Sequence, residues 1–243
     1  MTLIYHCLLE LHDHLYYATR EIGRLYETEA VLHNYGLCYA LGLVDSEIYA
    51  TQTDPDHGYR YFCGEQIPSY AAHLSRLNEA GIYVTPARSC GHTTVLTTWK
   101  YASNAYHVQM HPTQKNIPSY GRAKEIAPES RFEFFVITRH PIALPHWIRL
   151  GKWSSKAEVT LECLGKPTLT ADATHRCPLV LNPLDVMFSH RVISFDSINM
   201  PPVSLIQNAL IQGSWYELGE DQNLRLPAHM SFRFRHSLPG EER

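Results

Sequence analysis

The chain has 243 residues, of which 44% are hydrophobic, and its formal net charge is −3. This length allows one large domain or two small ones, and no run of about 18 apolar residues is present to cross a membrane. The six cysteines form no CxxC pair, and the first residues lack the basic and long apolar regions of a signal peptide. We therefore expect a reduced, cytoplasmic protein without membrane contact.

Residues 2–11 (TLIYHCLLEL) favour β structure and predict the first, central strand. A helix is expected within residues 18–43, because apolar side chains recur there at three- and four-residue steps and so share one helical face. These side chains are Val31, Tyr35, Cys38 and Leu41. Thr28 is the expected N-cap, and Gly42 is expected to end or bend the helix.

The turn before this helix carries two arginines, Arg20 and Arg24, with Gly23 between them. A charged, glycine-containing turn that leads into a buried helix is suited to holding an anion. Alternatively, the turn lies on the surface and its arginines pair with Glu21 and Glu27. The stretch alone fits this second interpretation at least as well.

The next segments predict a short helix followed by strands. The helix is expected at residues 68–80, where Tyr70, Leu74 and Leu77 share a face and Gly81 can end it. Strands are predicted at residues 82–85, 92–100 and 131–139, and a pair of strands at residues 147–162, linked at Gly151 and Lys152.

Residues 102–128 differ from the rest, with few aliphatic side chains, three prolines and several polar and basic residues. A loop this long is uncommon inside a compact domain and is usually functional, so we predict a thumb-like excursion. From about residue 178, short apolar runs alternate with Pro and Gly turns. They predict a β-rich C-terminal layer, with a short helix at residues 205–210.

A strand, a helix and later strands with few helices predict an α+β fold. We expect a ferredoxin-like (RRM-type) core with a thumb-like extension and an additional β-rich C-terminal layer. The core and the excursion are placed in residues 1–165, and the layer in residues 166–243. A β-sandwich is the structural alternative.

Charge is distributed unevenly along the chain. Residues 99–156 contain nine basic and three acidic side chains, a net charge of +6 inside an acidic protein. Such a concentration is typical of a surface that binds a polyanion. Tyr101, Tyr106 and Tyr120 lie among these charges and can stack on unpaired bases. The alternative is a solvated face without a ligand.

The Gly151–Lys152 pair, with Lys156 beyond it, can present backbone amides and two ammonium groups to phosphate. A β-hairpin turn with ordinary surface lysines fits the same residues equally well.

Two short motifs suggest metal binding. His12 and His14 point to the same face of a strand. Cys90 and His92 lie two positions apart. Neither pair has a second pair at ligand spacing, and no Walker loop, GxGxxG or GxSxG motif is present. We therefore expect no metal and no cofactor.

A metal-independent ribonuclease leaves little trace in a sequence, because it needs only a Tyr, His or Lys beside a ribose hydroxyl. Lys100, Tyr101 and His107 can supply such a set. With fifteen histidines and fifteen tyrosines in the chain, chance proximity is common, so this is the minority interpretation.

Three longer blocks carry a family resemblance: HDHLYYATREIGRLYETEAVLHNYGLCYALGL at residues 12–43, YGRAKEIAPESRFEFFV at 120–136 and PHWIRLGKW at 145–153. With them the chain resembles, over essentially its whole length, the Cas-five-type (Csc-one) subunit of type I-D CRISPR surveillance complexes (Cascade), which act in antiviral defence. The first block is far more specific than any short motif above.

The resemblance implies a non-catalytic RNA-binding subunit with a ferredoxin-like core and a thumb. Such a subunit caps the 5′ handle of the guide RNA (crRNA) at one end of a helical row of Cas-seven-type backbone subunits. It lies beside the Cas-ten-like large subunit, where target DNA enters and its short flanking motif (PAM) is read. A Cas-five relative in another subtype cuts precursor RNA, so a metal-independent endoribonuclease is the alternative. A scaffold that touches only protein is a third.

We expect the handle to be bound by residues from three segments: Arg20, Arg24, Asn34, Tyr35, Lys100, Tyr101, Arg149, Lys152 and Lys156. The excursion is expected to reach across the guide or target backbone with Lys115, Tyr120, Arg122 and Lys124. Together these residues are predicted to form one groove for an unpaired strand. No catalytic residue and no metal ligand is expected.

Overall fold

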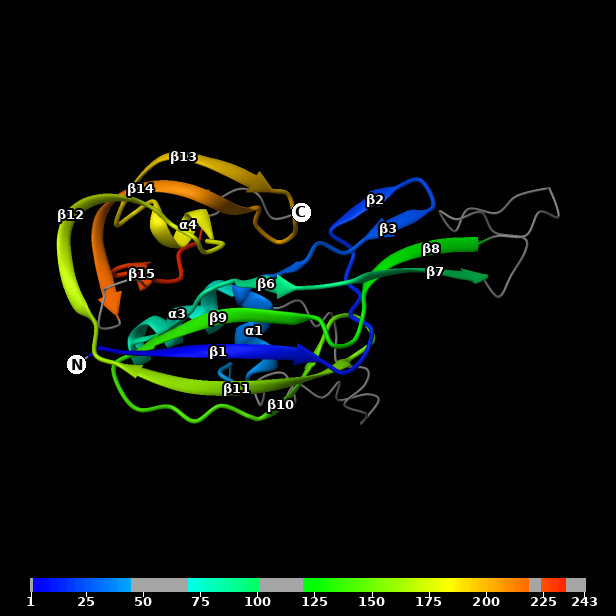
Figure 1. The fold of residues 1–243 in the computed structure, drawn as a ribbon, viewed down its shortest axis with the longest axis horizontal. Helices are drawn as coiled ribbons and strands as arrows, with labels where there is room; N and C mark the ends of the chain where they lie inside the picture. Colours follow the sequence, from blue (N-terminus) through cyan, green and yellow to red (C-terminus); the bar gives the residue numbers. More distant parts are fainter. Residues whose placement is uncertain (1, 45–69, 101–119, 219–223, 235–243) are drawn as a thin grey trace, which may run out of the picture.

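Residues 2–44, 70–100, 120–218 and 224–234 are described by the structure, which is a computed structural model. In this part of the chain β strands dominate and form three sheets, accompanied by three helices (Figure 1). No helix within these ranges has the length and apolar character needed to cross a membrane.

The central sheet has seven strands, each antiparallel to its neighbours. Six follow the order β10 (Trp147–Leu150), β11 (Ser155–Gly165), β1 (Leu3–Leu11), β9 (Arg131–Thr138), β6 (Ala87–Gly91) and β4 (Val31–Leu32). The seventh, β5 (Ile82–Val84), pairs with β9. The predicted central first strand, the strand at 82–85, the strand at 131–139 and the hairpin at 147–162 are confirmed.

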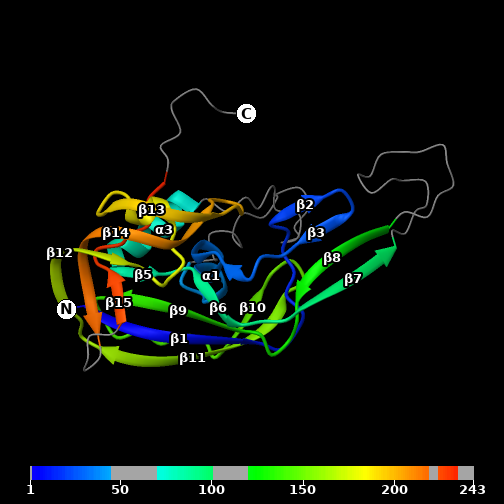
Figure 2. The ribbon, with the colours of Figure 1, turned by 45° about the horizontal axis from the view of Figure 1, so that its top comes forward.

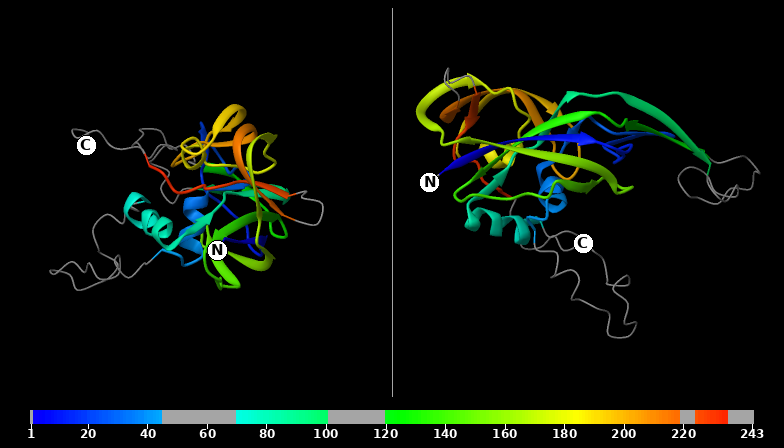
Figure 3. Two further views of the ribbon diagram at one scale, coloured as in Figure 1. Left: turned by 90° about the vertical axis from the view of Figure 1, so that its left-hand side faces the viewer. Right: turned by 60° about the horizontal axis from the view of Figure 1, so that its bottom comes forward.

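One face of this sheet is buried. Alternate side chains point to opposite faces of a strand, and β1 buries Leu3, Tyr5, Cys7, Leu9 and Leu11 on one of them. Helices α1 (Asn34–Ala40) and α3 (Tyr70–Ala80) cover this face (Figure 3). They add Leu37, Cys38, Leu74 and Leu77 to the same hydrophobic core. The predicted helix at 68–80 is thus confirmed from Tyr70 onward.

Helix α1 begins later than the sequence predicts. Its N-cap is His33, whose Nδ1 accepts a hydrogen bond from the Tyr35 amide at 3.1 Å. The expected cap, Thr28, instead donates its hydroxyl to the carbonyl of Tyr17 at 2.8 Å. Val31 lies in β4 rather than in the helix, because the ladder with β6 takes its backbone. Gly42 ends the helix as predicted, in the left-handed conformation with φ 67°.

The helices connect two parallel strands of the sheet, β1 and β5, and β9 lies between these strands. This is the split β-α-β unit that a ferredoxin-like core requires. The second such unit is incomplete, because the described residues between β9 and β11 form β10 and no helix. The ferredoxin-like expectation is therefore met in the first half of the core only.

A second sheet forms an arm at one end of the central sheet (Figures 1 and 2). Its order is β2 (Arg20–Ile22), β3 (Leu25–Glu27), β8 (Tyr120–Ile126) and β7 (Thr94–Lys100). Strands β7 and β8 project from the body in Figures 1 and 2 and in the right-hand view of Figure 3. Part of the predicted excursion, residues 120–126, is thus a regular strand, and residues 101–119 lie outside the described chain.

The third sheet is the predicted C-terminal β layer, with β14 (Leu205–Leu218) paired to β12 (Thr168–Arg176), β13 (Arg191–Ile198) and β15 (Leu224–Pro227). The helix predicted at residues 205–210 is wrong, because these residues pair with β13, and the last of them, Leu210, also pairs with Arg176 of β12. A short helix, α4 (Pro183–Val186), lies in this layer instead. The predicted boundary at residue 165 falls between β11 and β12; as a division into domains it stays a prediction.

Candidate nucleic-acid interface

The predicted glycine-containing turn is the tip of the β2–β3 hairpin. Gly23 has φ 62°, a left-handed conformation that glycine adopts without strain. The carbonyl of the next residue, Arg24, accepts a hydrogen bond from the amide of Arg122 at 2.8 Å. The turn is therefore joined to β8, on which most of the predicted thumb residues lie.

Strand register places the basic residues of the arm on one face. Lys100 lies opposite Tyr120, and Thr98 lies opposite Arg122. Paired positions share a face of the sheet, as do positions two apart along a strand. We call this surface the cationic arm face; the register gives it Arg20, Lys100, Tyr120, Arg122 and Lys124, and Arg24 joins it through its contact with the Tyr120 ring.

Tyr120 lies between two guanidinium groups on the cationic arm face. The guanidinium carbon of Arg24 is 4.7 Å from the centroid of the Tyr120 ring, and that of Arg122 is 5.8 Å away. Among the described residues no carboxylate pairs with Arg24, Arg122 or Lys124. These cations are therefore available to an external anion.

Arg20 is different, because two carboxylates bind it. Its Nη2 lies 2.6 Å from Oε2 of Glu27 and 3.0 Å from Oε1 of Glu29. The alternative interpretation of this stretch, in which an arginine pairs with Glu27, is confirmed for Arg20. The pairing fixes the base of the hairpin and reduces the charge that Arg20 can offer to a ligand.

The opposite face of the arm is aromatic. Trp99 pairs with Gly121, where an added Cβ would lie 3.1 Å from Cε2 of the indole, so the ring fills the space that a side chain would need. The Trp99 ring is 6.2 Å from that of Tyr26, 6.1 Å from that of Tyr16 and 6.3 Å from that of Trp153. We call these four residues the aromatic cluster.

Arg149, Lys152 and Lys156 form a second basic group at the β10–β11 turn. Nη1 of Arg149 donates to the carbonyl of Ser154 at 3.1 Å, and Nζ of Lys156 is 3.9 Å from the centroid of the Trp147 ring. The turn packs against the aromatic cluster through Trp153. The predicted residues are therefore divided between two surfaces on either side of the arm sheet and do not share one groove.

Two residues predicted to bind RNA, Asn34 and Tyr35, are buried. The side chains of Asn34 and Tyr35 are 0% and 2% exposed, because both belong to the buried face of α1. Nδ2 of Asn34 donates to Oδ2 of Asp185 at 2.9 Å. The hydroxyl of Tyr35 donates to the carbonyl of Arg233 at 3.3 Å. Neither side chain is accessible to RNA in this structure.

Three further predictions fall on residues outside the described chain. Tyr101 belongs to the predicted RNA-binding set and to the ribonuclease set, Lys115 to the predicted thumb, and His107 to the ribonuclease set. Lys100, the remaining member of the ribonuclease set, lies on the cationic arm face.

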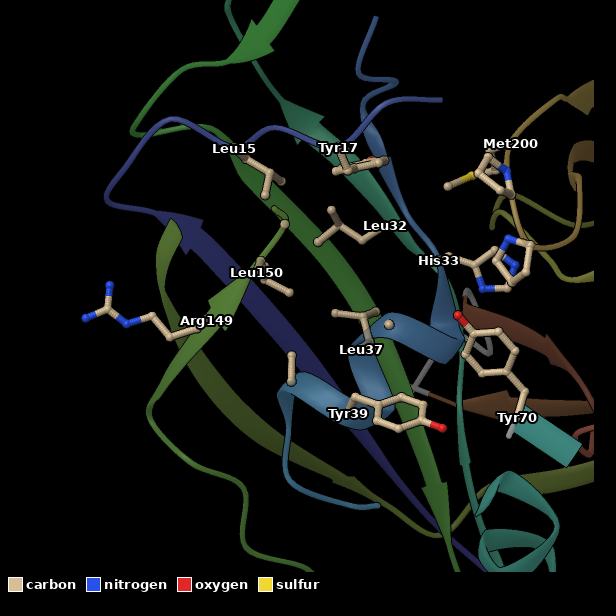
Figure 4. A pocket seen from close by; sticks show the side chains of 15 residues that line it. Leu15, Tyr17, Leu32, His33, Leu37, Tyr39, Tyr70, Arg149, Leu150 and Met200 are labelled. Carbon is tan, nitrogen blue, oxygen red and sulfur yellow. The ribbon is translucent and has the colours of Figure 1, made fainter. Parts of the chain in front are cut away.

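A pocket of about 470 Å³ lies between α1, the β10–β11 turn and the loop that contains Met200 (Figure 4). Its lining is mainly apolar. The hydroxyl of Tyr17 donates to the carbonyl of Glu29 at 2.6 Å. Burial lowers the pKa of His33 to about 4. Arg149 borders the pocket, but its guanidinium points away from the other labelled side chains. The pocket therefore has the character of a packing space rather than of a phosphate site.

The family model of the type I-D CRISPR-associated protein Cas5/Csc1 matches residues 2–235. The chain belongs to this Cas5/Csc1 family. The family resemblance read from the three sequence blocks is confirmed, and with it the setting of a CRISPR effector complex. None of the curated proteins matches the chain.

Two solved structures show distant similarity to this Cas5/Csc1 chain. One is a chain of the type III-B Cmr-beta complex bound to cognate target RNA and AMPPnP, with 10% identity, 86% coverage of both chains and a TM-score of 0.41. The other is the CRISPR associated protein Cas6, with 9% identity, coverage of 91% and 90%, and a TM-score of 0.32. Similarity at this level assigns neither fold nor function.

The metal motifs of the Cas5/Csc1 chain form no metal site in the described residues. Nε2 of His12 lies 3.3 Å from Oε2 of Glu158. Nδ1 of His14 lies 3.7 Å from Oε2 of Glu125, so the two histidines face different carboxylates. Nδ1 of His92 lies 2.9 Å from the hydroxyl of Ser89 rather than near a second ligand pair.

Sequence reasoning missed the aromatic cluster of this Cas5/Csc1 protein. Trp153 stands at the end of the quoted block PHWIRLGKW, beside the predicted Lys152, and was not singled out. A tryptophan next to a Gly-Lys turn in a basic segment was the available signal. Its partners Tyr16 and Trp99 come from segments that only the folded chain brings together.

Proposed function

We propose that this Cas5/Csc1 chain is a non-catalytic RNA-binding subunit of a type I-D CRISPR effector complex, and that its cationic arm face holds the 5′ handle of the crRNA. One observation supports this most strongly. Residues chosen from distant segments of the sequence, among them Arg24, Lys100 and Arg122, lie on one face of a projecting sheet. Unpaired RNA is bound through phosphate contacts and through stacking on aromatic rings, and this face offers both.

In this proposal the cations contact successive phosphates while Tyr120 offers the edge or face of its ring to a base. Each phosphate that a cation neutralises on a single strand makes the affinity fall with salt, with a slope of about −0.7 per contact. Lys115 and Tyr101 continue the predicted track into residues outside the described chain.

We further propose that the second basic group, Arg149, Lys152 and Lys156, contacts another stretch of nucleic acid, either the crRNA or target DNA near the PAM. It faces away from the cationic arm face, so a second strand can be held there without competing for the same cations. We further propose that a Cas-seven-type backbone subunit and a Cas-ten-like large subunit are the protein neighbours, as the family membership suggests.

No observation on the described residues favours the endoribonuclease alternative, for which Tyr101 and His107 are needed. A scaffold that touches only protein does not account for Arg24, Arg122 and Lys124, which pair with no carboxylate among the described residues. Incubation of the purified chain with labelled precursor crRNA in chelator tests the first alternative, because cleavage that is lost in Tyr101→Phe or His107→Ala would establish an enzyme.

The proposal itself is tested by guide RNA retention in the purified complex. Arg122→Ala with Lys124→Ala should lower the retained crRNA by roughly tenfold or more, since two charge-assisted contacts are lost. Lys166→Ala with Arg191→Ala is the matched control, because it removes the same charge from exposed positions in the C-terminal layer. Equal retention in both variants contradicts the proposal.

A further inference from the structure

The β10–β11 turn presents a tryptophan to solvent. Trp153 is 50% exposed, although an indole is among the side chains that gain most from burial. The turn is not a loosely held loop. The amide of Lys152 donates to the carbonyl of Tyr16 at 2.9 Å, which joins the turn to the segment after β1.

Backbone conformation fixes the turn in this place. Gly151 has φ 69°, and an added Cβ would lie 2.6 Å from the carbonyl oxygen of Tyr16. Ser154 has φ 54°, also in the left-handed region. Glycine is needed at position 151 both for its conformation and for the close approach of the two backbones. The position of the exposed indole is thus determined by the fold.

The rings of Tyr16 and Trp99 pack against the Trp153 indole. The Trp153 ring lies 4.7 Å from the ring of Tyr16 at an interplanar angle of 34°, and 6.3 Å from the ring of Trp99 at 78°. Tyr16 is only 6% exposed, so it anchors this group in the body of the protein. A rigid, half-exposed aromatic ring on such a support is the arrangement that single-strand binding proteins use for stacking bases.

Two basic residues belong to the same turn as this ring. Lys152 precedes Trp153 directly, and the described residues show no ion pair for its ammonium group. Arg149 lies at the other end of the same turn. Oδ2 of Asp13 lies 4.0 Å from Nη1 of Arg149, so this carboxylate is paired with Arg149 rather than with Lys152.

The second exposed tryptophan, Trp147, differs because other side chains of the protein contact its ring. Trp147 is 44% exposed, but the ammonium group of Lys156 lies 3.9 Å from the centroid of its ring. His12 and His146 pack edge-on against it at 5.0 and 5.3 Å. Among the described residues no cation lies over Trp153 in this way, and the residue is 50% exposed.

We propose that Trp153 is a stacking platform for one unpaired base of a single-stranded nucleic acid, and that Lys152 contacts the adjacent phosphate. The site is separate from the cationic arm face. The inference rests on the proposed function in assuming that a nucleic-acid strand reaches this subunit. A protein neighbour is the other class of partner for an exposed tryptophan, but the unopposed lysine and the basic segment around it favour a polyanion.

The test uses the full chain and two fluorescent probes of about eight nucleotides, one an oligo-U ribonucleotide and one an oligo-dT deoxyribonucleotide, because such sites span roughly 4–16 nucleotides. Trp153→Ala should weaken binding about 5- to 150-fold, which corresponds to the loss of one stacked base. Its salt slope should stay unchanged because no charge is removed. Trp153→Phe should recover most of the affinity, and Trp147→Ala should change it by less than about twofold. A larger loss with the RNA probe indicates the guide as the source, and a larger loss with the DNA probe indicates the target.

The outcomes separate this inference from the proposed function. If Trp153→Ala binds both probes like the wild type while Arg122→Ala with Lys124→Ala binds weakly, the platform is refuted and the arm assignment survives. If only Trp153→Ala weakens binding, the platform stands and the arm assignment fails. Loss of a protein neighbour from the purified complex of Trp153→Ala, with unchanged binding of both probes, also refutes the platform.

Discussion

The guanidinium carbon of Arg24 lies 4.7 Å from the centroid of the Tyr120 ring. The two residues are far apart in the chain and meet because β3 pairs in parallel with β8. A cation over an exposed aromatic face contributes about 0.5–1 kcal/mol. The contact therefore holds the β2–β3 turn against β8 and fixes one cation at the centre of the cationic arm face.

The salt dependence of binding reports how many phosphates the arm contacts. For Arg122→Ala with Lys124→Ala, we expect the slope of log K against log salt for single-stranded RNA to decrease in magnitude by about 1.4, since each contact contributes about 0.7. Fluorescence anisotropy at several salt concentrations measures it. The Lys166→Ala, Arg191→Ala control should keep the wild-type slope, and an unchanged slope in the arm variant would show that these two cations touch no phosphate.

The position of the β10–β11 turn depends on Gly151. Gly151→Ala should lower the free energy of unfolding more than Gly42→Ala does, although the two glycines have nearly the same φ, 69° and 67°. Both variants bear the cost of a left-handed alanine, about 1–2 kcal/mol. Only at Gly151 does the new Cβ meet a backbone carbonyl, whereas nothing lies within 4 Å of a Cβ at Gly42.

Urea unfolding of the full chain measures this difference. We expect Gly151→Ala to be about 1–3 kcal/mol less stable than Gly42→Ala, the usual cost of overpacking. Equal stabilities would mean that the turn is not pressed against Tyr16.

A buried acid joins the C-terminal layer to the core. Asp185 on α4 is 1% exposed, and it accepts hydrogen bonds from Nδ2 of Asn34 at 2.9 Å, from the hydroxyl of Tyr83 at 3.0 Å and from the amide of Arg233 at 3.1 Å. Burial raises the pKa of its carboxyl to about 7, and the three hydrogen bonds offset part of that rise. The folded state thus binds a proton that the unfolded state, with a pKa near 3.8, releases.

The free energy of unfolding should therefore fall as pH rises from about 4 to about 7, and this contribution should be lost above pH 7. Asp185→Asn should remove it, so that the difference between wild type and variant changes by up to about 1.4 kcal/mol per pH unit in this window. Thermal unfolding of both proteins at pH 5, 6, 7 and 8 measures it, and other titrating groups cancel in the comparison. Parallel pH profiles would show that Asp185 does not carry the shift.

Local patterns predicted most of the strands but not the exact helix. The β-favouring residues of positions 2–11 and the apolar spacing of Leu74 and Leu77 are local signals, and both elements are confirmed. The start of α1 depends on β4 pairing with β6, and residues 205–210 form a strand because they pair with β13. Such distant pairings override a short helical pattern.

The candidate site could be predicted only in part, because distant pairings also decide which of its residues lie together. Residue type indicated basic and aromatic members of the arm, strand register placed five of them together, and Arg24 joins them through its contact with Tyr120. Asn34 and Tyr35 were assigned to RNA because they lie near the charged turn, but the helical spacing already put Tyr35 on the buried face. The partner that buries Asn34 is Asp185, which no local pattern connects to it.

The most direct test of the central claim is a density map of the purified effector complex that contains this subunit. The account predicts unpaired crRNA along the cationic arm face, with density for a phosphate beside Arg24 or Arg122 and for a base near Tyr120. A map in which protein or solvent covers this face, with the crRNA handle elsewhere, would contradict it.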